Sequence, residues 1–419
     1  MKQSVLPLLL LVTFGVTAQQ IDQVSVGAGY INQTYYSLSS GNTSASSLEA
    51  WDIAFNVNPS MASVFINEGV ASGAGAQGPV SAWLTSASDF NTVTISDTVD
   101  YLRNPDVSWS EGAFNTPAAA GNPADFGWGL YDFVTHEVNG NRVFIIQLRS
   151  GAYKKFMVES LITGTFTFKW ADLDGGNEVT STLDQTAYSK KIVYYSLTNN
   201  AVVDVEPANW DMLFTRFSQA LDAGDGSVLE YNVGGALIAP NVFVAQANGV
   251  DPSSVEFVDY EAHLTDSIDV IGHDWRYFDL GSFSWITLSD RVYFLTTESD
   301  SLFQMQFIDF EGSSTGVITL EKEYLGQYVN TPEFHDLNGF AMYPNPTSSK
   351  VNLTLDWADA GTEGSYRIVD LQGRVVSEES FRVETGYNRQ AIQLDAAPGM
   401  YVVTMTVGTA QTTERLIIQ

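Results

Sequence analysis

Histidine is the residue of this chain best suited to bind a metal ion, because a neutral imidazole nitrogen offers a lone pair. The 419 residues include only four histidines. His263 and His273 lie in one predicted loop, and His136 lies in a predicted turn with the sequence Thr-His-Glu-Val. We therefore expect any imidazole ligand to come from these three residues. The alternative for each is a loop histidine that only faces solvent, and His335 is set aside because it lies in a predicted linker.

An acidic turn is the second candidate site. Residues 172–178 read Asp-Leu-Asp-Gly-Gly-Asn-Glu, and clustered carboxylates beside a turn glycine suit the hard cation Ca²⁺. In this interpretation Asp172, Asp174 and Asn177 supply the oxygen ligands. The segment lacks the complete calcium-loop pattern, and acidic turns rich in Gly and Asn also close ordinary hairpins. Both interpretations of this segment, a calcium site and a plain hairpin turn, stay open.

Other motifs give little support for catalysis. Met212 and Met305 have thioether sulfurs, but both occupy predicted strand positions typical of a core. Residues 73–78 match a dinucleotide-binding fingerprint, but they lie in a Gly/Ala/Ser loop without the required strand and helix. Residues 312–316 match Gly-x-Ser-x-Gly by letter only, because a nucleophile elbow needs a helix after the motif and none is predicted there, and the chain has no His-Glu-x-x-His motif. With 49 acidic residues, any carboxylate pair proposed for glycoside hydrolysis would be arbitrary.

Composition excludes several classes of protein. The 49 Asp and Glu against 19 Lys and Arg give a net charge of -30, which is incompatible with binding a nucleic-acid backbone. The absence of cysteine excludes disulfides, thiol catalysis, iron–sulfur clusters and Cys-based zinc sites. A hydrophobic fraction of 44%, with 24 Phe, 19 Tyr and 9 Trp, is enough for several packed cores. The length predicts two or three domains.

The elements that must position the candidate residues are predicted to be strands. Segments 143–148 and 292–297 are rich in β-branched and aromatic residues. Segments 165–170 and 317–321 alternate in the way of strands with one buried face. No long stretch has sustained helical periodicity. The sequence therefore predicts an all-β, predominantly antiparallel protein.

An internal repeat organises these strands. Three motifs occur in the same order in both halves: Tyr-Tyr-Ser-Leu at 35 and 194, Trp-Asp at 51 and 210, and Trp at 128 and 275. The first two pairs share an offset of 159 residues. We therefore predict two homologous antiparallel β modules, residues 19–185 and 186–332, in which paired tryptophans anchor equivalent cores.

The N-terminus predicts export. Lys2 precedes an apolar run from residue 6 to residue 16, and small residues follow at the expected cleavage positions. Residues 1–18 are therefore predicted to be a secretory signal peptide. The run is too short for a membrane span, which needs about 20 residues. No other segment is apolar enough, so we expect no transmembrane segment in the mature chain.

The C-terminal segment has its own strand pattern. After a predicted linker at 333–339, residues 340–419 contain a Pro-Asn-Pro entry, a Leu-Gln-Gly-Arg turn and a Pro-Gly-Met-Tyr step between short alternating strands. This pattern predicts an Ig-like β-sandwich. The segment resembles the C-terminal sorting domain of the type IX secretion pathway. The resemblance implies that the type IX secretion machinery binds residues 340–419 and that the protein is secreted or attached to the outer-membrane surface.

The repeated Tyr-Tyr-Ser-Leu and Trp-Asp motifs, with the segment 288–319, resemble the HmuY-like family of haem-binding surface proteins. The resemblance is closer in the second predicted module than in the first. It implies an all-β fold in which two lobes hold a haem between them. The family holds the iron through two axial side chains, which are His or Met.

The ligand set does not carry over with the fold. In the family pattern, one axial His lies a few residues beyond the Trp that precedes the Arg-Val strand. Counting from Trp275 and Trp128 leads to Leu280 and Phe133, and neither side chain can ligate iron. The candidate haem ligands that remain are His263, His273 and His136.

Three functions follow as hypotheses. The first is an exported, non-enzymatic binding protein that captures haem or a related porphyrin. The second keeps the fold without haem, as a surface scaffold or adhesin. The third is a secreted hydrolase, which no motif in the sequence supports.

Overall fold

The computed structural model describes residues 19–328, except 59, 60, 73–75 and 106, and residues 340–419, except 358–361, 371, 385, 395 and 409. The predicted signal peptide (1–18) and linker (333–339) lie outside the described residues. Strands β1 to β30 and seven short 3₁₀ turns make up the regular structure, and the described residues contain no α-helix. The all-β prediction is therefore confirmed. No helix in this part of the chain could cross a membrane.

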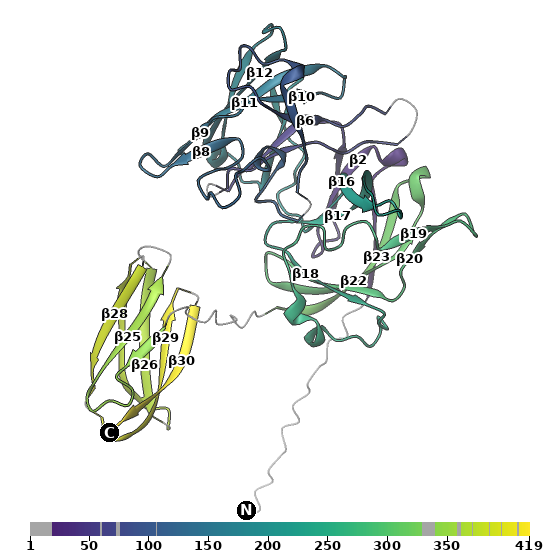
Figure 1. The fold of residues 1–419 in the computed structure, drawn as a ribbon. Coiled ribbons are helices and arrows are strands. Elements are labelled where there is room, and N and C mark those ends of the chain that lie inside the picture. Colours follow the sequence, from purple (N-terminus) through teal and green to yellow (C-terminus); the bar gives the residue numbers. More distant parts are fainter. Residues whose placement is uncertain are drawn as a thin grey trace, which may run out of the picture. The chain divides into compact units, whose positions relative to one another are not determined.

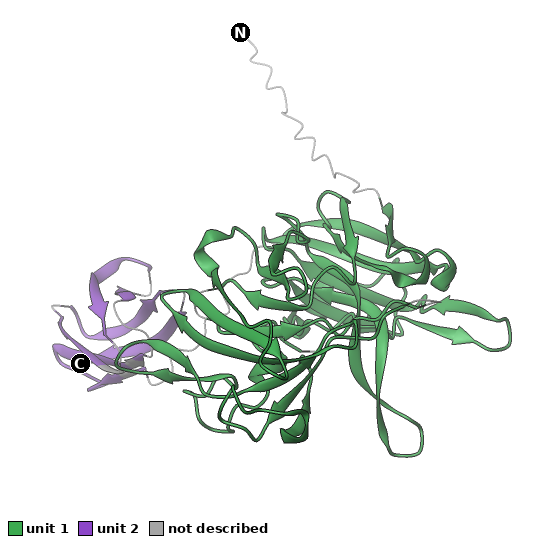
Figure 2. Ribbon diagram, turned by 90° about the horizontal axis from the view of Figure 1, so that it is seen from above, with its two compact units in different colours: residues 1–328 green, residues 329–419 purple. Residues whose placement is uncertain are grey.

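The chain forms two compact units, residues 1–328 and 329–419 (Figure 2). Unit 2 contains two antiparallel sheets, ordered β24-β25-β28 and β27-β26-β29-β30. Its strands are β24 (Ala341–Tyr343), β25 (Lys350–Trp357), β26 (Thr362–Asp370), β27 (Val375–Val383), β28 (Gly386–Gln393), β29 (Gly399–Val407) and β30 (Ala410–Ile418). Alternating residues of β25, among them Val351 and Leu353, are buried in one core. This arrangement fits the predicted β-sandwich.

Unit 1 has two lobes, which we name after the tryptophan buried in each. The Trp128 lobe holds the sheets β13-β12-β11-β10-β6-β7, with β8 and β9 attached, and β15-β14-β4-β5. Its strands are β4 (Ile53–Asn56), β5 (Val64–Ile66), β6 (Ser81–Thr85), β7 (Thr98–Leu102), β8 (Gly129–Asp132), β9 (Glu137–Gly140), β10 (Phe144–Gln147), β11 (Tyr153–Ile162), β12 (Thr165–Asp172), β13 (Val179–Asp184), β14 (Ile192–Ser196) and β15 (Ala201–Val203).

The Trp275 lobe holds the sheets β1-β23-β22-β21-β18, β17-β16-β2-β3 and β19-β20. Its strands are β1 (Gln20–Ser25), β2 (Asn32–Tyr36), β3 (Thr43–Ser47), β16 (Met212–Asp222), β17 (Val228–Ile238), β18 (Phe243–Asn248), β19 (Arg276–Asp279), β20 (Ser284–Thr287), β21 (Arg291–Thr296), β22 (Ser301–Phe310) and β23 (Val317–Gln327). The 3₁₀ turns are η1 (Ala28–Tyr30), η2 (Ile95–Asp97), η3 (Ala113–Asn115), η4 (Gln185–Ala187), η5 (Phe257–Asp259), η6 (Glu261–His263) and η7 (Gly312–Ser314).

Each lobe takes strands from both halves of the sequence. The first strands, β1 and β2, pair with β23 and β16 in the Trp275 lobe, while β14 pairs with β4 in the Trp128 lobe. Figure 1 shows the purple N-terminal strand β2 beside the teal strand β16. Strand pairing therefore crosses the predicted module boundary between residues 185 and 186 in both directions. The modules 19–185 and 186–332 themselves stay a prediction.

The two crossing pairs have the same register. The partners are Tyr36 with Met212 and Tyr35 with Leu213 in one pair, and Tyr195 with Ile53 and Tyr194 with Ala54 in the other. Adding 159 to the number of Tyr36 gives Tyr195, and adding 159 to that of Ile53 gives Met212. The offset found between the sequence motifs therefore also relates the two strand pairs.

The carboxylate of each Trp-Asp motif accepts a hydrogen bond from a backbone N–H of the segment that follows the crossing strand. The carboxylate of Asp211 accepts a hydrogen bond of 2.7 Å from the Leu38 N–H, and the carboxylate of Asp52 accepts one of 3.3 Å from the Thr198 N–H and one of 3.2 Å from the Ser196 hydroxyl. Both aspartates are buried. Burial raises the pKa of Asp211, although the Leu38 N–H and nearby cations oppose this shift.

The predicted core residues are buried. Trp128 and Trp275 lie in separate hydrophobic clusters, and Trp128 donates its indole N–H to the carbonyl of Ala62 at 2.7 Å. Met212 and Met305 are fully buried in the Trp275 lobe, as the strand pattern predicts.

Replacing Asp211 by alanine tests whether the crossing strand depends on this carboxylate. The change leaves the buried N–H of Leu38 without its acceptor, so we expect the free energy of unfolding to fall by about 1–3 kcal/mol. Urea denaturation followed by tryptophan fluorescence measures it. Asp225→Ala, in the exposed turn between β16 and β17, is the control and should change stability by less than about 0.5 kcal/mol. Equal stability of the two variants would contradict the assignment.

Candidate functional site

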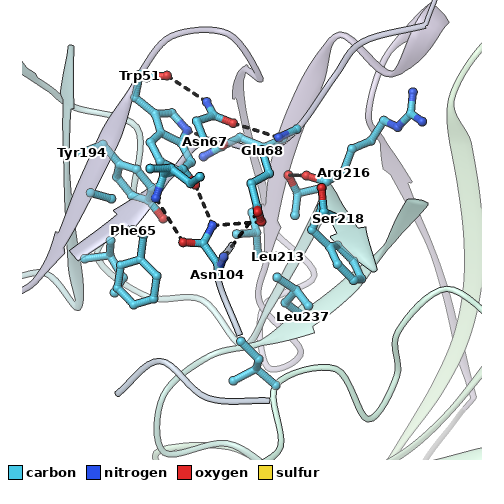
Figure 3. A pocket seen from close by; sticks show the side chains of 18 of the residues that line it. Trp51, Phe65, Asn67, Glu68, Asn104, Tyr194, Leu213, Arg216, Ser218 and Leu237 are labelled. Atoms are coloured by element: carbon cyan, nitrogen blue, oxygen red, sulfur yellow. Dashed lines mark hydrogen bonds between the residues drawn. The ribbon is translucent and has the colours of Figure 1, made fainter. Parts of the chain in front are cut away.

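A cavity of about 80 Å³ lies where β4, β5 and β14 of the Trp128 lobe meet β16 and β17 of the Trp275 lobe. Its wall is mostly aromatic and aliphatic, as Figure 3 shows with Trp51, Phe65, Tyr194, Leu213 and Leu237. An apolar wall with a few polar groups is typical of a small-molecule site. The cavity is smaller than the engineered cavities of about 150 Å³ that bind benzene.

Two aromatic pairs frame this region in matching ways. Trp51 meets the ring of Tyr194 edge-on with 4.8 Å between centroids, and Tyr35 meets Trp210 edge-on with 5.1 Å. The hydroxyl of Tyr35 donates to that of Tyr194 at 2.8 Å. Because both phenols are buried, their pKa values rise and the hydroxyls stay protonated. Trp51 and Trp210 therefore have equivalent surroundings, each packed against the tyrosine that begins the other half's motif.

Amide side chains fix the polar part of the wall. Asn67 donates to the carbonyls of Leu48 and Trp51 at 2.8 and 2.9 Å. Asn104 donates to the Ile66 carbonyl at 2.7 Å and to the Glu68 carboxylate at 3.1 Å. Figure 3 shows the bonds of Asn67 to Trp51 and of Asn104 to Glu68 beside the cavity. Asn104 thereby connects the segment after β7 to strand β5.

The segment between β7 and β8 covers the cavity. Trp109 of this segment packs its ring 5.8 Å from Phe65 and donates its indole N–H to the carbonyl of Ile238 at 2.8 Å. The N–H of Ile268 donates to the carbonyl of Val107 at 3.2 Å. These bonds connect the covering segment to β17 and to the loop before β19. Opening the cavity on this side requires breaking them.

The sequence patterns identify neither Asn104 nor Trp109 as site residues. Both lie in an irregular segment without periodicity or motif, and only the fold brings them to the cavity. The one available signal was the Trp-Asp motif, which places Trp51 beside the site.

The three candidate histidines lie elsewhere, since none of them lines the cavity. His136 lies in the turn between β8 and β9, where its Nδ1 is 2.7 Å from the hydroxyl of Tyr131. His263 ends η6 and is exposed. His273 is half-buried in the loop before β19, and burial lowers its pKa. The structure places His263 and His273 in one connection, as predicted, and His136 in the other lobe.

The two positions matched to the family's axial ligand are exposed. Leu280 in the turn between β19 and β20 is 75% exposed, and Phe133 in the turn between β8 and β9 is 67% exposed. Their side chains offer iron no lone pair. These positions therefore do not fit a haem ligand set.

The acidic turn at 172–178 joins β12 to β13 as a hairpin. Asp172 forms an ion pair with Lys154 and accepts a hydrogen bond of 2.6 Å from the amide nitrogen of Asn177. Asp174 accepts one of 2.8 Å from the backbone N–H of Gly176. These contacts suffice for an ordinary turn, and calcium binding at Asp172, Asp174 and Asn177 stays a prediction.

Replacing Trp109 by phenylalanine should loosen the covering segment. The variant keeps an aromatic ring but loses the hydrogen bond to Ile238, so we expect opening to become easier by about 1 kcal/mol. Hydrogen exchange at the amide of Ile268 should then be about fivefold faster. Trp83→Phe, in β6, is the matched control. Equal exchange in the wild type and in Trp109→Phe would contradict this role for Trp109.

Comparison with known proteins identifies two regions. The family model described as HmuY protein matches residues 29–170, and that described as secretion system C-terminal sorting domain matches residues 341–419. No curated protein matches the chain. Among solved structures, dimeric latent PorU from Porphyromonas gingivalis is 10% identical over 68% of this chain, with a TM-score of 0.17. The chain spans only 31% of that protein's length, and so weak a likeness carries no argument.

The two matches bear directly on the predicted organisation. The HmuY match falls within the first predicted module, although the motifs resemble the family more closely in the second, so a second HmuY module stays a prediction. The sorting-domain match confirms the C-terminal prediction, and the protein is therefore secreted or attached to the outer-membrane surface. Two regions of the chain therefore match known families: an HmuY domain at residues 29–170 and a type IX C-terminal sorting domain at residues 341–419.

Proposed function

We propose that this exported protein is a non-enzymatic binding protein that captures haem or a related porphyrin. The observation that carries the proposal is the aromatic cavity between the two lobes, in a chain with an HmuY domain. Trp51, Phe65, Trp109 and Tyr194 offer flat apolar surfaces, which suit a large conjugated ring.

Capture requires the cavity to open. A volume of about 80 Å³ is far too small for a porphyrin ring. The covering segment with Trp109 lies outside the strands and is joined to β17 by the Trp109 hydrogen bond to Ile238, so we take its displacement as the entrance. Because the open form is the minor one, the apparent affinity is lower than the intrinsic affinity by the open fraction.

The polar groups of the cavity support binding rather than catalysis. The amides of Asn67 and Asn104 hold backbone carbonyls, and the carboxylate of Glu68 accepts hydrogen bonds from Asn104. A general base must instead be free to reach a substrate proton. These side chains shape the wall.

The family's axial positions carry Leu280 and Phe133 and offer no ligand for iron. Of the candidate histidines, His273 is the one with a half-buried ring. Burial lowers its pKa, which favours the neutral imidazole that a metal ligand must be. His273 does not line the aromatic cavity, so we assign the aromatic wall the role of holding the ring and test His273 separately as the iron ligand of the opened form.

Titration with haemin and with metal-free protoporphyrin IX tests both roles. We expect a saturable shift of the haemin Soret band and a saturable rise in porphyrin fluorescence. His273→Ala should weaken haemin binding about tenfold while leaving protoporphyrin binding unchanged, because it removes only the iron contact. His136→Ala, on an exposed turn, is the matched control and should bind both like the wild type. An unchanged Soret band together with unchanged porphyrin fluorescence would exclude this function.

A surface adhesin is the second candidate function, and the exposed hairpin turns favour it. Phe133 and Val134 lie at the turn between β8 and β9, and Leu280 and Phe283 lie at the turn between β19 and β20, all with largely exposed side chains. Exposed apolar groups of this kind commonly mark interaction sites.

Binding to immobilised extracellular-matrix proteins distinguishes the adhesin from the haem protein. An adhesin should bind the matrix without haemin affinity, and Phe133→Ser combined with Phe283→Ser should reduce the bound fraction by about tenfold, because both apolar contacts are lost. Tyr153→Ser, at another exposed aromatic position, is the control. Matrix binding that is unchanged in the double variant would count against the hairpin turns.

A further inference from the structure

Two arginines line a second, smaller cavity that adjoins the aromatic cavity at Thr215 and Arg216. This second cavity, of about 20 Å³, is lined by Arg216 of β16, Arg276 of β19 and the ring of Tyr30, with Asn32 and Thr215. Figure 3 shows the guanidinium of Arg216 directed away from Glu68. The guanidinium of Arg216 therefore belongs to the arginine cavity, although the residue also lines the aromatic cavity.

The two arginine side chains lie against neighbouring positions of β17. A Cβ atom placed on Gly234 would lie 3.6 Å from Nη2 of Arg276 and 3.9 Å from Cγ of Arg216. One Nη2 bond anchors each side chain: Arg276 donates to the Gly234 carbonyl at 2.8 Å, and Arg216 donates to the Asn232 carbonyl. The backbone of β17 thus holds both guanidinium groups beside the cavity.

The remaining buried N–H groups have no acceptor. Nε of Arg216 and both Nε and Nη1 of Arg276 are buried without a hydrogen-bond partner. Neither arginine forms an ion pair with any carboxylate in the described part of the chain, although acidic residues outnumber basic ones 49 to 19 in the sequence. Buried charges in proteins are normally paired. Burial accordingly lowers the pKa of both arginines, that of Arg276 to about 10.

Aromatic packing compensates for only part of this cost. The guanidinium of Arg276 lies 3.9 Å from the ring centre of Trp275 and 4.1 Å from that of Phe310, and the guanidinium of Arg216 lies 5.5 Å from that of Tyr30. Cation–π attraction offsets part of the cost of removing the two ions from water, and three guanidinium nitrogens still lack acceptors.

We propose that Arg216 and Arg276 form a binding site for one carboxylate group of a ligand. A carboxylate carries two acceptor oxygens, so one oxygen can accept from the unoccupied Nη1 of Arg276 and the other from the unoccupied Nε of Arg216. The cavity volume of about 20 Å³ corresponds to roughly one water molecule, so a flat carboxylate enters more easily than a tetrahedral phosphate. Tyr30, Arg216 and Arg276 remain partly exposed, which leaves the site accessible from solvent. The site does not depend on the proposed porphyrin capture.

Thermal unfolding of the full chain in sodium acetate tests the site. We expect the midpoint of unit 1 to rise with acetate and to saturate, because a ligand that binds only the folded state stabilises it by mass action. Acetamide, the neutral isostere, and chloride at the same ionic strength should not produce this rise. An acetate effect no larger than that of chloride or acetamide overturns the proposal even if no variant folds. An equal effect of phosphate overturns the assignment to carboxylates.

Substitutions then locate the site. Arg276→Gln and Arg216→Gln should each raise the acetate concentration needed for half of the effect by about tenfold, and the double variant should lose the effect. Arg103→Gln is the matched control, because Arg103 forms a surface ion pair with Glu230. Retention of the acetate effect in a folded double variant also overturns the proposal.

Discussion

The structure of unit 1 depends on one reciprocal contact, in which the strand after each Trp-Asp motif pairs with the Tyr-Tyr-Ser-Leu strand of the other half. The buried carboxylates of Asp52 and Asp211 accept hydrogen bonds from the backbone N–H groups that follow the Tyr-Tyr-Ser-Leu strands. An isolated half would expose an unpaired strand edge and a charge without its donor. Both lobes, and the aromatic cavity between them, therefore exist only while the two halves are paired.

The sequence predicts strands far better than it predicts their neighbours. β10 lies within the predicted segment 143–148, and β21 overlaps the predicted segment 292–297. Both were predictable because β-branched and aromatic residues suit a pleated surface. A period of two shows which face of a strand is buried, but β16 could pair with any strand of compatible pattern. The site was harder still, since Asn104 and Trp109 belong to an irregular segment that tertiary contacts alone bring to the cavity.

Charge and burial are distributed unevenly in this protein. Acidic residues outnumber basic residues 49 to 19. Arg216 and Arg276 are nevertheless partly buried among aromatic rings without a paired carboxylate. The family's axial positions, in contrast, carry exposed apolar side chains in hairpin turns. Both proposed binding sites therefore rest on ring surfaces and guanidinium groups rather than on the positions matched to the family's axial ligand.

The pairing of β1 with β23 also constrains the order of assembly. Gln20 of β1 lies opposite Lys322 of β23. β1 therefore cannot pair until a strand 302 residues further along the chain has been synthesised. Contacts between such distant segments close slowly. During biosynthesis the Trp275 lobe thus stays incomplete until nearly all of unit 1 has been synthesised, and β1 has an unpaired edge until then.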